Sequence, residues 1–174
     1  MAHKYISEPI VEYQMEKPYA AIAFETVDVE WEEAAALIPE IIEWLSKRKL
    51  KAAGMPLYRY WCSSGNGDEA FTLEVGVPVD RMATGDERVV VSTIPGGSYL
   101  KAIHRGHPDN LPESHEALVQ WALAEGLEFD KRWEEEYEIW NGRFEVFLTD
   151  PEIEPDPEKW EIEILLLLVR DEAA

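Results

Sequence analysis

The feature that most constrains the fold of this chain is a succession of segments that occurs twice in the same order. In each half, a strand-like segment precedes an amphipathic helix, and an aromatic strand and a closing strand follow it. The helical segment 41–45 (Ile-Ile-Glu-Trp-Leu) corresponds to 118–122 (Leu-Val-Gln-Trp-Ala), and the strand segment 73–75 corresponds to 162–164. Several elements that recur in one order indicate an internal duplication.

The repeat predicts an α+β fold of two β-α-β-β halves with pseudo-two-fold symmetry, in which antiparallel sheets carry helices on one face. The halves span residues 5–80 and 88–170, and a polar connector with Gly85 joins them. With 174 residues, the chain suits a single domain over 1–174 with a sizeable apolar core. We expect a ligand groove between the halves.

The boundaries of the first-half elements follow from two prolines. Residues 5–29 are expected to form a strand or a bent pair of strands, with Pro18 at an edge or a bend because it cannot donate a ladder hydrogen bond. Apolar residues recur at helical spacing over 31–50. Pro39 lies inside this helix and predicts a kink or two short helices, because it lacks a backbone N–H.

The second half is expected to begin with two strands, broken at residues 95–97. A helix should then start at Asn110, with Glu113 completing a capping box, and end at Gly126. The pair Asn141-Gly142 favours a two-residue type I′ turn, so segments 133–140 and 143–148 are predicted to form a hairpin.

The strand 143–151 (Arg-Phe-Glu-Val-Phe-Leu-Thr-Asp-Pro) holds the candidate site. Phe144, Val146 and Leu148 should share one face, and Glu145 and Phe147 the other, because strand side chains alternate. A carboxylate beside an aromatic ring on one face indicates a binding site for a lipophilic cation, which would supply the charge that a buried carboxylate lacks. Two alternatives remain: a surface glutamate, or a structural pair with Arg143 or with Arg59.

Composition limits the partners. The net charge of −20, from 36 acidic and 16 basic residues, repels phosphate backbones and anionic membranes, so direct nucleic-acid binding is not expected. The same acidity is also typical of ordinary soluble proteins. The single cysteine, Cys62, allows no intramolecular disulfide, and the longest apolar run, 164–169, is too short for a membrane span. These features favour a cytoplasmic protein that does not bind membranes.

Sequence motifs give no support for metal or phosphate chemistry. His104, His107 and His115 lie close in the sequence, but their spacing matches no tight ligand set, so they are interpreted as structural residues. The glycine-rich phosphate loops and the nucleophile elbow of hydrolases do not occur. No metal and no cofactor are predicted.

The chain resembles the GyrI-like small-molecule-binding domain, the effector-binding module of some bacterial multidrug-responsive regulators, which also occurs as a free-standing protein. The resemblance covers nearly the whole chain from about Tyr5. The segments that carry it are 71–79, 94–99, 104–106, 118–121, 126–127, 145–151 and 161–164. It implies an aromatic-lined cavity between duplicated halves, with Glu145 as the acid and Phe147 at a position where many relatives have tyrosine. The DNA-reading helices of the regulators have no counterpart in this sequence.

Aromatic residues on the predicted strands could stack against a planar cation, although core packing explains them equally well. The predicted ligand-binding residues are Glu145, Phe147, Tyr137, Trp140, Trp133, Tyr60, Trp61 and Tyr99. The first hypothesis is a stand-alone binding protein for planar, lipophilic, often cationic small molecules. The second, which the resemblance suggests, is a hydrolase of cyclopropane-bearing alkylating compounds that uses Glu145. The third is a protein-interaction module like the gyrase-inhibiting relatives.

Overall fold

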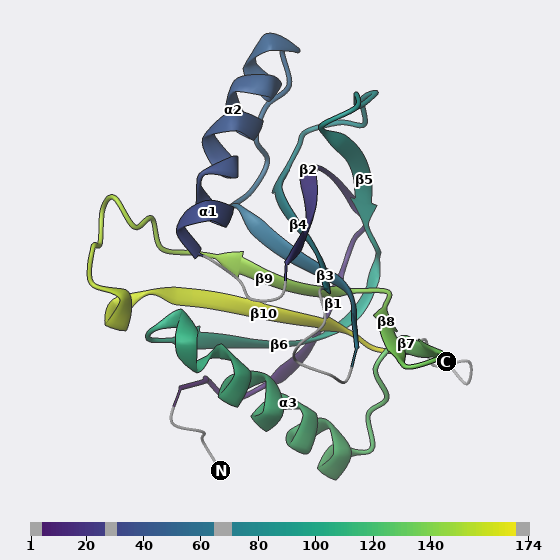
Figure 1. The fold of residues 1–174 in the computed structure, drawn as a ribbon. Helices are drawn as coiled ribbons and strands as arrows, with labels where there is room; N and C mark the ends of the chain where they lie inside the picture. Colours follow the sequence, from purple (N-terminus) through teal and green to yellow (C-terminus); the bar gives the residue numbers. More distant parts are fainter. Residues whose placement is uncertain (1–4, 27–30, 65–70, 170–174) are drawn as a thin grey trace.

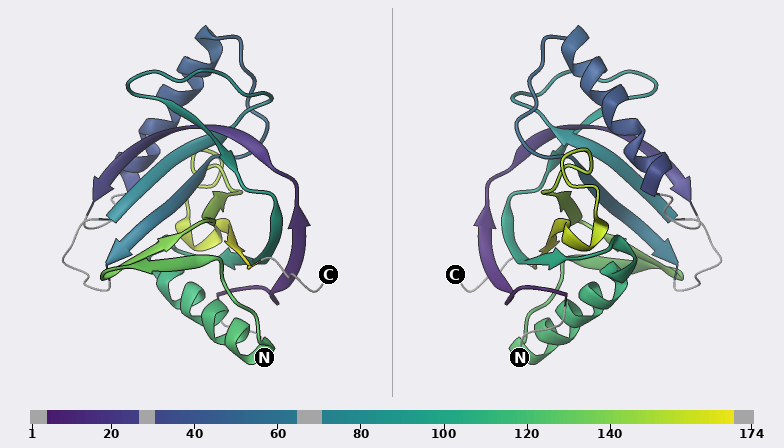
Figure 2. Two further views of the ribbon diagram at one scale, coloured as in Figure 1. Left: turned by 90° about the vertical axis from the view of Figure 1, so that its right-hand side faces the viewer. Right: turned by 90° about the vertical axis from the view of Figure 1, so that its left-hand side faces the viewer.

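The computed structural model describes residues 5–26, 31–64 and 71–169 and shows a mixed α+β fold. Its central element is a curled antiparallel sheet, and the helices α2 and α3 pack on the outer side of the curl (Figures 1 and 2). The α+β class with an antiparallel sheet and helices on one face is therefore confirmed. None of the helices in the described residues is long and apolar enough to cross a membrane.

The strands follow the predicted order closely. They are β1 (Ile10–Gln14), β2 (Lys17–Thr26), β3 (Leu57–Ser64), β4 (Phe71–Pro78), β5 (Val90–Ile94), β6 (Gly97–Arg105), β7 (Lys131–Glu134), β8 (Tyr137–Trp140), β9 (Arg143–Phe147) and β10 (Glu161–Leu167). Pro18 lies near the start of β2, just after the bend that separates β1 from β2, and residues 95–96 separate β5 from β6. Both predicted interruptions are thus confirmed; residues 27–29 lie outside the described residues.

The strands are arranged in the order β1-β6-β10-β9-β3-β4-β2-β5, with β8 on β3 and β7 on β8. The first-half strand β3 and the second-half strand β9 are neighbours at the centre. The order of the six inner strands, β6-β10-β9-β3-β4-β2, is symmetric about its centre. In this symmetry β2 corresponds to β6, β3 to β9 and β4 to β10. Two β-α-β-β halves would produce this order, and the duplication itself stays a prediction.

A long ladder joins the two ends of the curled sheet. It starts at Ile10↔Lys101 between β1 and β6 and reaches Ala21↔Val90 between β2 and β5. Both strand pairs have the same register, so the ladder continues across the bend without a shift in the residue pairing. Because β1 leads into β2 and β5 leads into β6, this ladder connects the first half of the chain to the second and holds the sheet in its curl (Figure 2).

Side chains form three apolar clusters. The first lies between α2 and the outer face of β2, β3 and β4, and includes Ile41, Tyr58 and Val75. The second lies between α3 and the outer face of β6 and β10, and includes Leu118 and Ile164. The third fills the inside of the curl with residues from both halves: Tyr19, Ala21, Leu57, Ile94, Tyr99, Phe144, Leu165 and Leu167. The sheet is therefore covered by side chains on both faces.

The first helical segment is divided, as Pro39 predicts. It consists of α1 (Trp31–Ala35) and α2 (Leu37–Lys47), and the break lies at Ala36. Pro39 thereby falls in the first turn of α2, where a backbone N–H would have no partner within the helix.

The second helical segment is α3 (Leu111–Glu125), preceded by the 3-10 turn η1 (Pro108–Asn110). It ends as predicted at Gly126, which has the left-handed φ of 72°. The predicted capping box is wrong: the side chain of Asn110 caps no N–H, because the preceding turn holds its backbone in the helical region. The side chain of His107 caps η1 instead, since it accepts from the N–H of Asp109.

The predicted hairpin across Asn141-Gly142 is also wrong. β8 folds back on β7, whereas β9 pairs with β10, and both β8 and β9 lie end to end along the same edge of β3. A type I′ turn needs positive φ at both central residues, and neither Asn141 nor Gly142 has it. Glycine is required at position 142 because there is no room for a side chain: a Cβ added there would lie 2.7 Å from the Cβ of Leu167. The turn of the β7–β8 hairpin uses Glu135, with a φ of 57°.

Candidate functional site

Glu145 lies in the middle of β9, where the two helix-covered clusters meet. Its side chain is almost entirely buried, with 2% exposed, and its partner across the ladder is Tyr58 of β3. Phe147, on the same outer face, packs against both clusters, whereas Phe144 and Val146 face the inside of the curl. The predicted alternation along this strand is confirmed up to Phe147, where the strand ends.

Two hydrogen bonds hold the carboxylate of Glu145. The hydroxyl of Tyr60 donates to Oε1 over 2.5 Å, and Nε2 of His115 lies 2.7 Å from Oε2. Because a carboxylate only accepts, Nε2 of His115 carries the proton in this contact. β3, β9 and α3 each contribute one side chain to this arrangement. The surface alternative for Glu145 is thereby removed, and its direct partners are neither Arg143 nor Arg59.

The carboxylate remains ionised although it is buried. Burial raises the pKa of Glu145, but the hydrogen bonds of His115 and Tyr60 and the charge of Arg143 outweigh this effect and lower the pKa below its ordinary value. Burial lowers the pKa of His115, and the charge of Arg143 lowers it further, against the opposing effect of Glu145. At neutral pH the pair is therefore a carboxylate and a neutral imidazole.

A second histidine, His104, forms hydrogen bonds at the start of α3, close to His115. His104 of β6 is fully buried; its Nε2 lies 3.1 Å from the carbonyl oxygen of His107, and its Nδ1 lies 2.7 Å from Oγ of Ser114. The carbonyl can only accept, so Nε2 carries the proton and Nδ1 accepts from the hydroxyl of Ser114. This contact fixes the turn of α3 that presents His115 to Glu145.

Aromatic rings surround the carboxylate on the β3 side. Tyr58 and Tyr60 lie on the outer face of β3, and the ring of Tyr58 contacts Phe147 edge-on with centroids 4.5 Å apart. Burial raises the pKa of both tyrosines, and the charge of Glu145 raises it further. Both phenols therefore stay protonated, and Tyr60 stays a donor.

Arg143 brings a positive charge to the same face of β9. Its guanidinium carbon lies 5.1 Å from the ring centroid of Tyr60 and 5.2 Å from that of Trp140, within the range of cation–π attraction. Its Nε is buried and has no hydrogen-bond partner among the described residues. Arg143 is thus held mainly by ring faces.

The structure brings together some of the predicted ligand-binding residues and separates others. Glu145, Phe147 and Tyr60 lie at one site, and Trp140 joins them through Arg143. Trp133 and Tyr137 lie on the β7–β8 hairpin and are 59% and 37% exposed.

The other two predicted residues are turned toward the inside of the curl. Tyr99 belongs to the inner cluster. Trp61 stacks 3.7 Å from the guanidinium of Arg59, which contacts Tyr19 and Phe144 of the same cluster. Neither ring lies beside Glu145.

The inner face has a polar cluster of its own. Arg59 donates to the hydroxyl of Tyr19 over 2.9 Å, and Tyr19 donates to Glu74 over 2.5 Å. Arg59 also donates to the carbonyl oxygens of Thr93 and Asn141. Burial and the charge of Glu74 raise the pKa of Tyr19, against the opposing charge of Arg59, so the phenol stays protonated. This cluster ties strands of both halves together.

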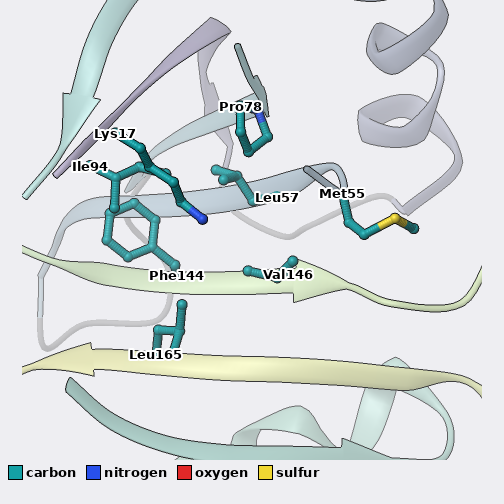
Figure 3. Close-up of a pocket in the computed structure, with 8 residues that line it drawn as sticks. All are labelled: Lys17, Met55, Leu57, Pro78, Ile94, Phe144, Val146 and Leu165. Carbon is teal, nitrogen blue, oxygen red and sulfur yellow. The ribbon is translucent and has the colours of Figure 1, made fainter. Parts of the chain in front are cut away.

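Two hollows lie away from Glu145. A narrow one of about 30 Å³ opens on the inner face, where Met55, Leu57, Phe144 and Val146 are among its lining side chains (Figure 3). It has room for about one water molecule. An open one of about 390 Å³ lies by the β7–β8 hairpin, lined by Cys62, Glu134, Glu135, Tyr137 and Ile139. Among the described residues, no three histidines, cysteines or carboxylates are grouped to hold a metal ion.

Sequence reasoning missed the role of His115 and considered Arg143 only as a structural partner of Glu145. His115 lies on the apolar stripe of α3 with Leu111, Leu118 and Ala122, so its position resembles that of an ordinary core residue. One signal could have identified it: His115 is a polar side chain on the buried face of a helix, and a buried polar side chain needs a hydrogen-bond partner, which a buried acid can supply. Arg143 shares the parity of Glu145 on β9, which places both on one face.

Comparisons with known proteins agree with this architecture. The family model of the GyrI-like small molecule binding domain matches residues 7–169. The C-terminal domain of EcmrR superposes with a TM-score of 0.73 at 16% identity, covering 97% of this chain and 100% of that domain. EcmrR in a DNA complex gives a TM-score of 0.76 at 17% identity, covering 94% of this chain. This chain spans 58% of that EcmrR chain.

Two further structures have the same fold. A hydrolase from Listeria innocua gives a TM-score of 0.61 at 16% identity, covering 93% of this chain and 92% of that one. SAV2435, solved with tetraphenylphosphonium bound, gives 0.55 at 12% identity, covering 94% of both chains. No curated protein matches the sequence. Since the family model matches nearly the whole chain and the fold agrees, the protein belongs to the GyrI-like small-molecule-binding domain family.

Proposed function

We propose that this domain binds planar, lipophilic, often cationic small molecules, with Glu145 as the counter-ion and the rings of Tyr58, Tyr60 and Phe147 as stacking surfaces. The observation that carries the proposal is a buried, ionised carboxylate whose direct partners, Tyr60 and His115, are both neutral donors. These donors stabilise the charge without forming an ion pair with it, and Arg143 acts on it through its charge, with no direct hydrogen bond to the carboxylate. A cation that reaches the site gains an ion pair in a medium of low dielectric constant.

The aromatic rings add binding energy of a less specific kind. A cation over a ring face gains about 0.5–2 kcal/mol, and flat rings accept many planar shapes. Charge selectivity combined with loose shape selectivity is the property expected of a multidrug-binding domain. SAV2435, which has this fold, is solved with the lipophilic cation tetraphenylphosphonium bound. Because Glu145 is 2% exposed, a ligand has to displace covering side chains to reach it.

Matched probes test the proposal: N-methylacridinium, a planar cation, and acridine, its neutral counterpart at mildly alkaline pH. We expect Glu145→Gln to weaken the binding of N-methylacridinium about tenfold or more and to change that of acridine much less, because a tenfold loss corresponds to about 1.4 kcal/mol. Fluorescence titration of the intact protein measures both affinities.

The control is Glu74→Gln, which alters a buried glutamate on the inner face that hydrogen-bonds Tyr19. This variant should bind both probes like the wild type, provided that thermal unfolding shows it to be folded. Equal losses for cation and neutral probe in Glu145→Gln would contradict the counter-ion role.

The contact between Glu145 and His115 also supports a second candidate, the hydrolysis of cyclopropane-bearing alkylating compounds. Glu145 would accept a proton from a water molecule whose oxygen attacks a ring carbon. The C–C bond that breaks would leave its electron pair on the conjugated carbonyl, and the proton that Glu145 accepted from water would pass to the carbonyl oxygen, which restores the carboxylate. The similar Listeria innocua protein is described as a hydrolase.

Mass spectrometry tests this candidate directly. The intact domain should add one water to an electrophilic cyclopropane substrate, and Glu145→Gln should lower kcat at least about a hundredfold, the usual contribution of a positioned general base. Turnover that survives in Glu145→Gln would exclude Glu145 as the base and leave the binding function in place.

A further inference from the structure

Arg143 occupies a position that a planar cationic ligand would also favour. It precedes Glu145 by two residues on β9, so both side chains emerge on the same outer face. Its guanidinium lies 5.1 Å from the ring of Tyr60, and Tyr60 itself donates to Glu145. The same guanidinium lies 5.2 Å from the ring of Trp140. A flat cation close to two aromatic rings and to a carboxylate is the arrangement expected for a bound ligand.

The half-buried Arg143 is held by fewer hydrogen bonds than the buried Arg59. The terminal nitrogens of Arg59 donate three hydrogen bonds, to the hydroxyl of Tyr19 and to the carbonyl oxygens of Thr93 and Asn141. Nε has no hydrogen-bond partner among the described residues in either arginine. The difference lies at the terminal nitrogens, since the guanidinium of Arg143 is placed against the rings of Tyr60 and Trp140 instead. A buried donor without a partner is unfavourable, so little hydrogen bonding is lost when Arg143 moves away.

The charge balance of the site depends on Arg143. With His115 neutral, the negative charge of Glu145 and the positive charge of Arg143 sum to zero. A neutral planar ligand leaves this balance unchanged. A monovalent cation that enters beside Arg143 would create a net positive charge in a buried site, where like charges are strongly unfavourable. A ligand cation therefore gains the full electrostatic attraction to Glu145 only when the side chain of Arg143 moves away.

We propose that Arg143 is a specificity-determining residue: it occupies the position beside the rings of Tyr60 and Trp140 and shifts the preference of the Glu145 site from cationic toward uncharged planar ligands. This proposal rests on the proposed binding function and specifies its ligand class. In the wild-type protein, neutral planar aromatic molecules compete well with cations of the same shape. Removal of the arginine charge turns the site into a cation-selective one.

Arg143→Met tests the proposal, because methionine keeps an unbranched apolar side chain and removes the charge. We expect the affinity for N-methylacridinium to rise about tenfold and that for acridine to change less than about threefold, in keeping with the strength of a cation–π contact and of a nearby charge. Arg143→Lys keeps the charge and should retain a preference close to that of the wild type. Fluorescence titration of intact protein measures the ratio of the two affinities.

Lys131→Met is the matched control. Nζ of Lys131 lies 4.8 Å from the ring of Trp140, so this variant removes one positive charge beside the same tryptophan but not beside Tyr60. Its affinity ratio should equal that of the wild type. Thermal unfolding of each variant checks that the sheet is intact, and a purely structural role of Arg143 would change stability without changing the ratio.

The outcomes separate the two proposals. An unchanged ratio in Arg143→Met, or equal gains for both probes, overturns the role of Arg143 and leaves the binding function standing. The same ratio shift in Lys131→Met also overturns it, because the effect would then come from charge in general. If no variant binds either probe, the binding function fails and this inference fails with it.

Discussion

Glu145 and Glu74 are both buried glutamates of one sheet, but their partners give them different chemistry. Glu74 accepts from Tyr19, whose hydroxyl in turn accepts from Arg59, so a fixed cation lies at the end of a short hydrogen-bonded chain. Glu145 accepts from Tyr60 and from a neutral His115. Arg143 acts on Glu145 through its charge but forms no hydrogen bond with it, so a cation can still pair directly with the carboxylate. Glu145 is therefore the glutamate suited to ligand binding, and Glu74 the one suited to structure.

The histidine at the site predicts how stability responds to acid. Burial and the charge of Arg143 lower the pKa of His115, against the raising effect of Glu145. A group with a lower pKa in the folded state takes up its proton more readily when unfolded, so stability falls as the pH drops below the unfolded value of about 6.5. We expect the free energy of unfolding to fall between about pH 7 and pH 5, and to fall less in His115→Gln, as measured by urea denaturation.

Two other groups contribute to this pH response. Burial also lowers the pKa of His104, which leaves a residual slope in His115→Gln. The lowered pKa of Glu145 destabilises the fold only at more acidic pH, below its ordinary value of 4.5. Tyr60→Phe is the control: it removes a hydrogen bond to Glu145 but no imidazole, so it should lower stability without changing the slope. Identical slopes for wild type and His115→Gln would contradict the assignment.

At the scale of elements, the link between β8 and β9 shows how packing can override a turn signal. Asn-Gly usually marks a type I′ turn, yet here it joins two strands that lie along the same edge of β3. Contact with Leu167, rather than positive φ, requires the glycine. The real turn, at Glu135, contains no glycine or asparagine at its positive φ and therefore gave no signal in the sequence.

Substitutions at Gly142 distinguish these two requirements. Gly142→Ala should lower the free energy of unfolding by about 1–3 kcal/mol, as overpacking typically does, because its Cβ would lie 2.7 Å from that of Leu167. Gly142→Asn should be at least as destabilising, since the cost grows with side-chain size. Denaturant unfolding of both variants measures the effect. If Asn were tolerated better than Ala, a positive φ would be the governing requirement, because Asn adopts it readily.

Periodicity within a segment was enough to predict the helices, the break near Pro39, the Gly126 terminus and the face on which Glu145 lies. It could not predict the neighbours of Glu145, because they come from distant strands and helices. Tyr58 reaches Glu145 through the pairing of β3 with β9, and His115 reaches it through the packing of α3. A single sequence gives no register between segments so far apart, so Trp61 and Tyr99 could not be told from Tyr60 as neighbours of the acid.

At the scale of the whole molecule, the curled sheet separates two environments. Its outer face carries the helices and the Glu145 site, and its inner face carries the cluster of Arg59, Tyr19 and Glu74. Since adjacent residues of one strand point to opposite faces, each of β3 and β9 contributes to both. The acid that would bind ligand and the network that would hold the curl therefore belong to neighbouring residue pairs of the β3–β9 ladder.

The ladder that joins Ile10 to Lys101 and Ala21 to Val90 also governs how the chain must fold. Its partners are separated by roughly half of the sequence, so the contact order is high and the loop-closure entropy is large. Neither half can complete its sheet during synthesis until the other has emerged, because β5 and β6 supply the partners of β2 and β1. Folding is therefore expected to be slow, with closure of this ladder as a late step, and either half expressed alone should expose unpaired strand edges and aggregate.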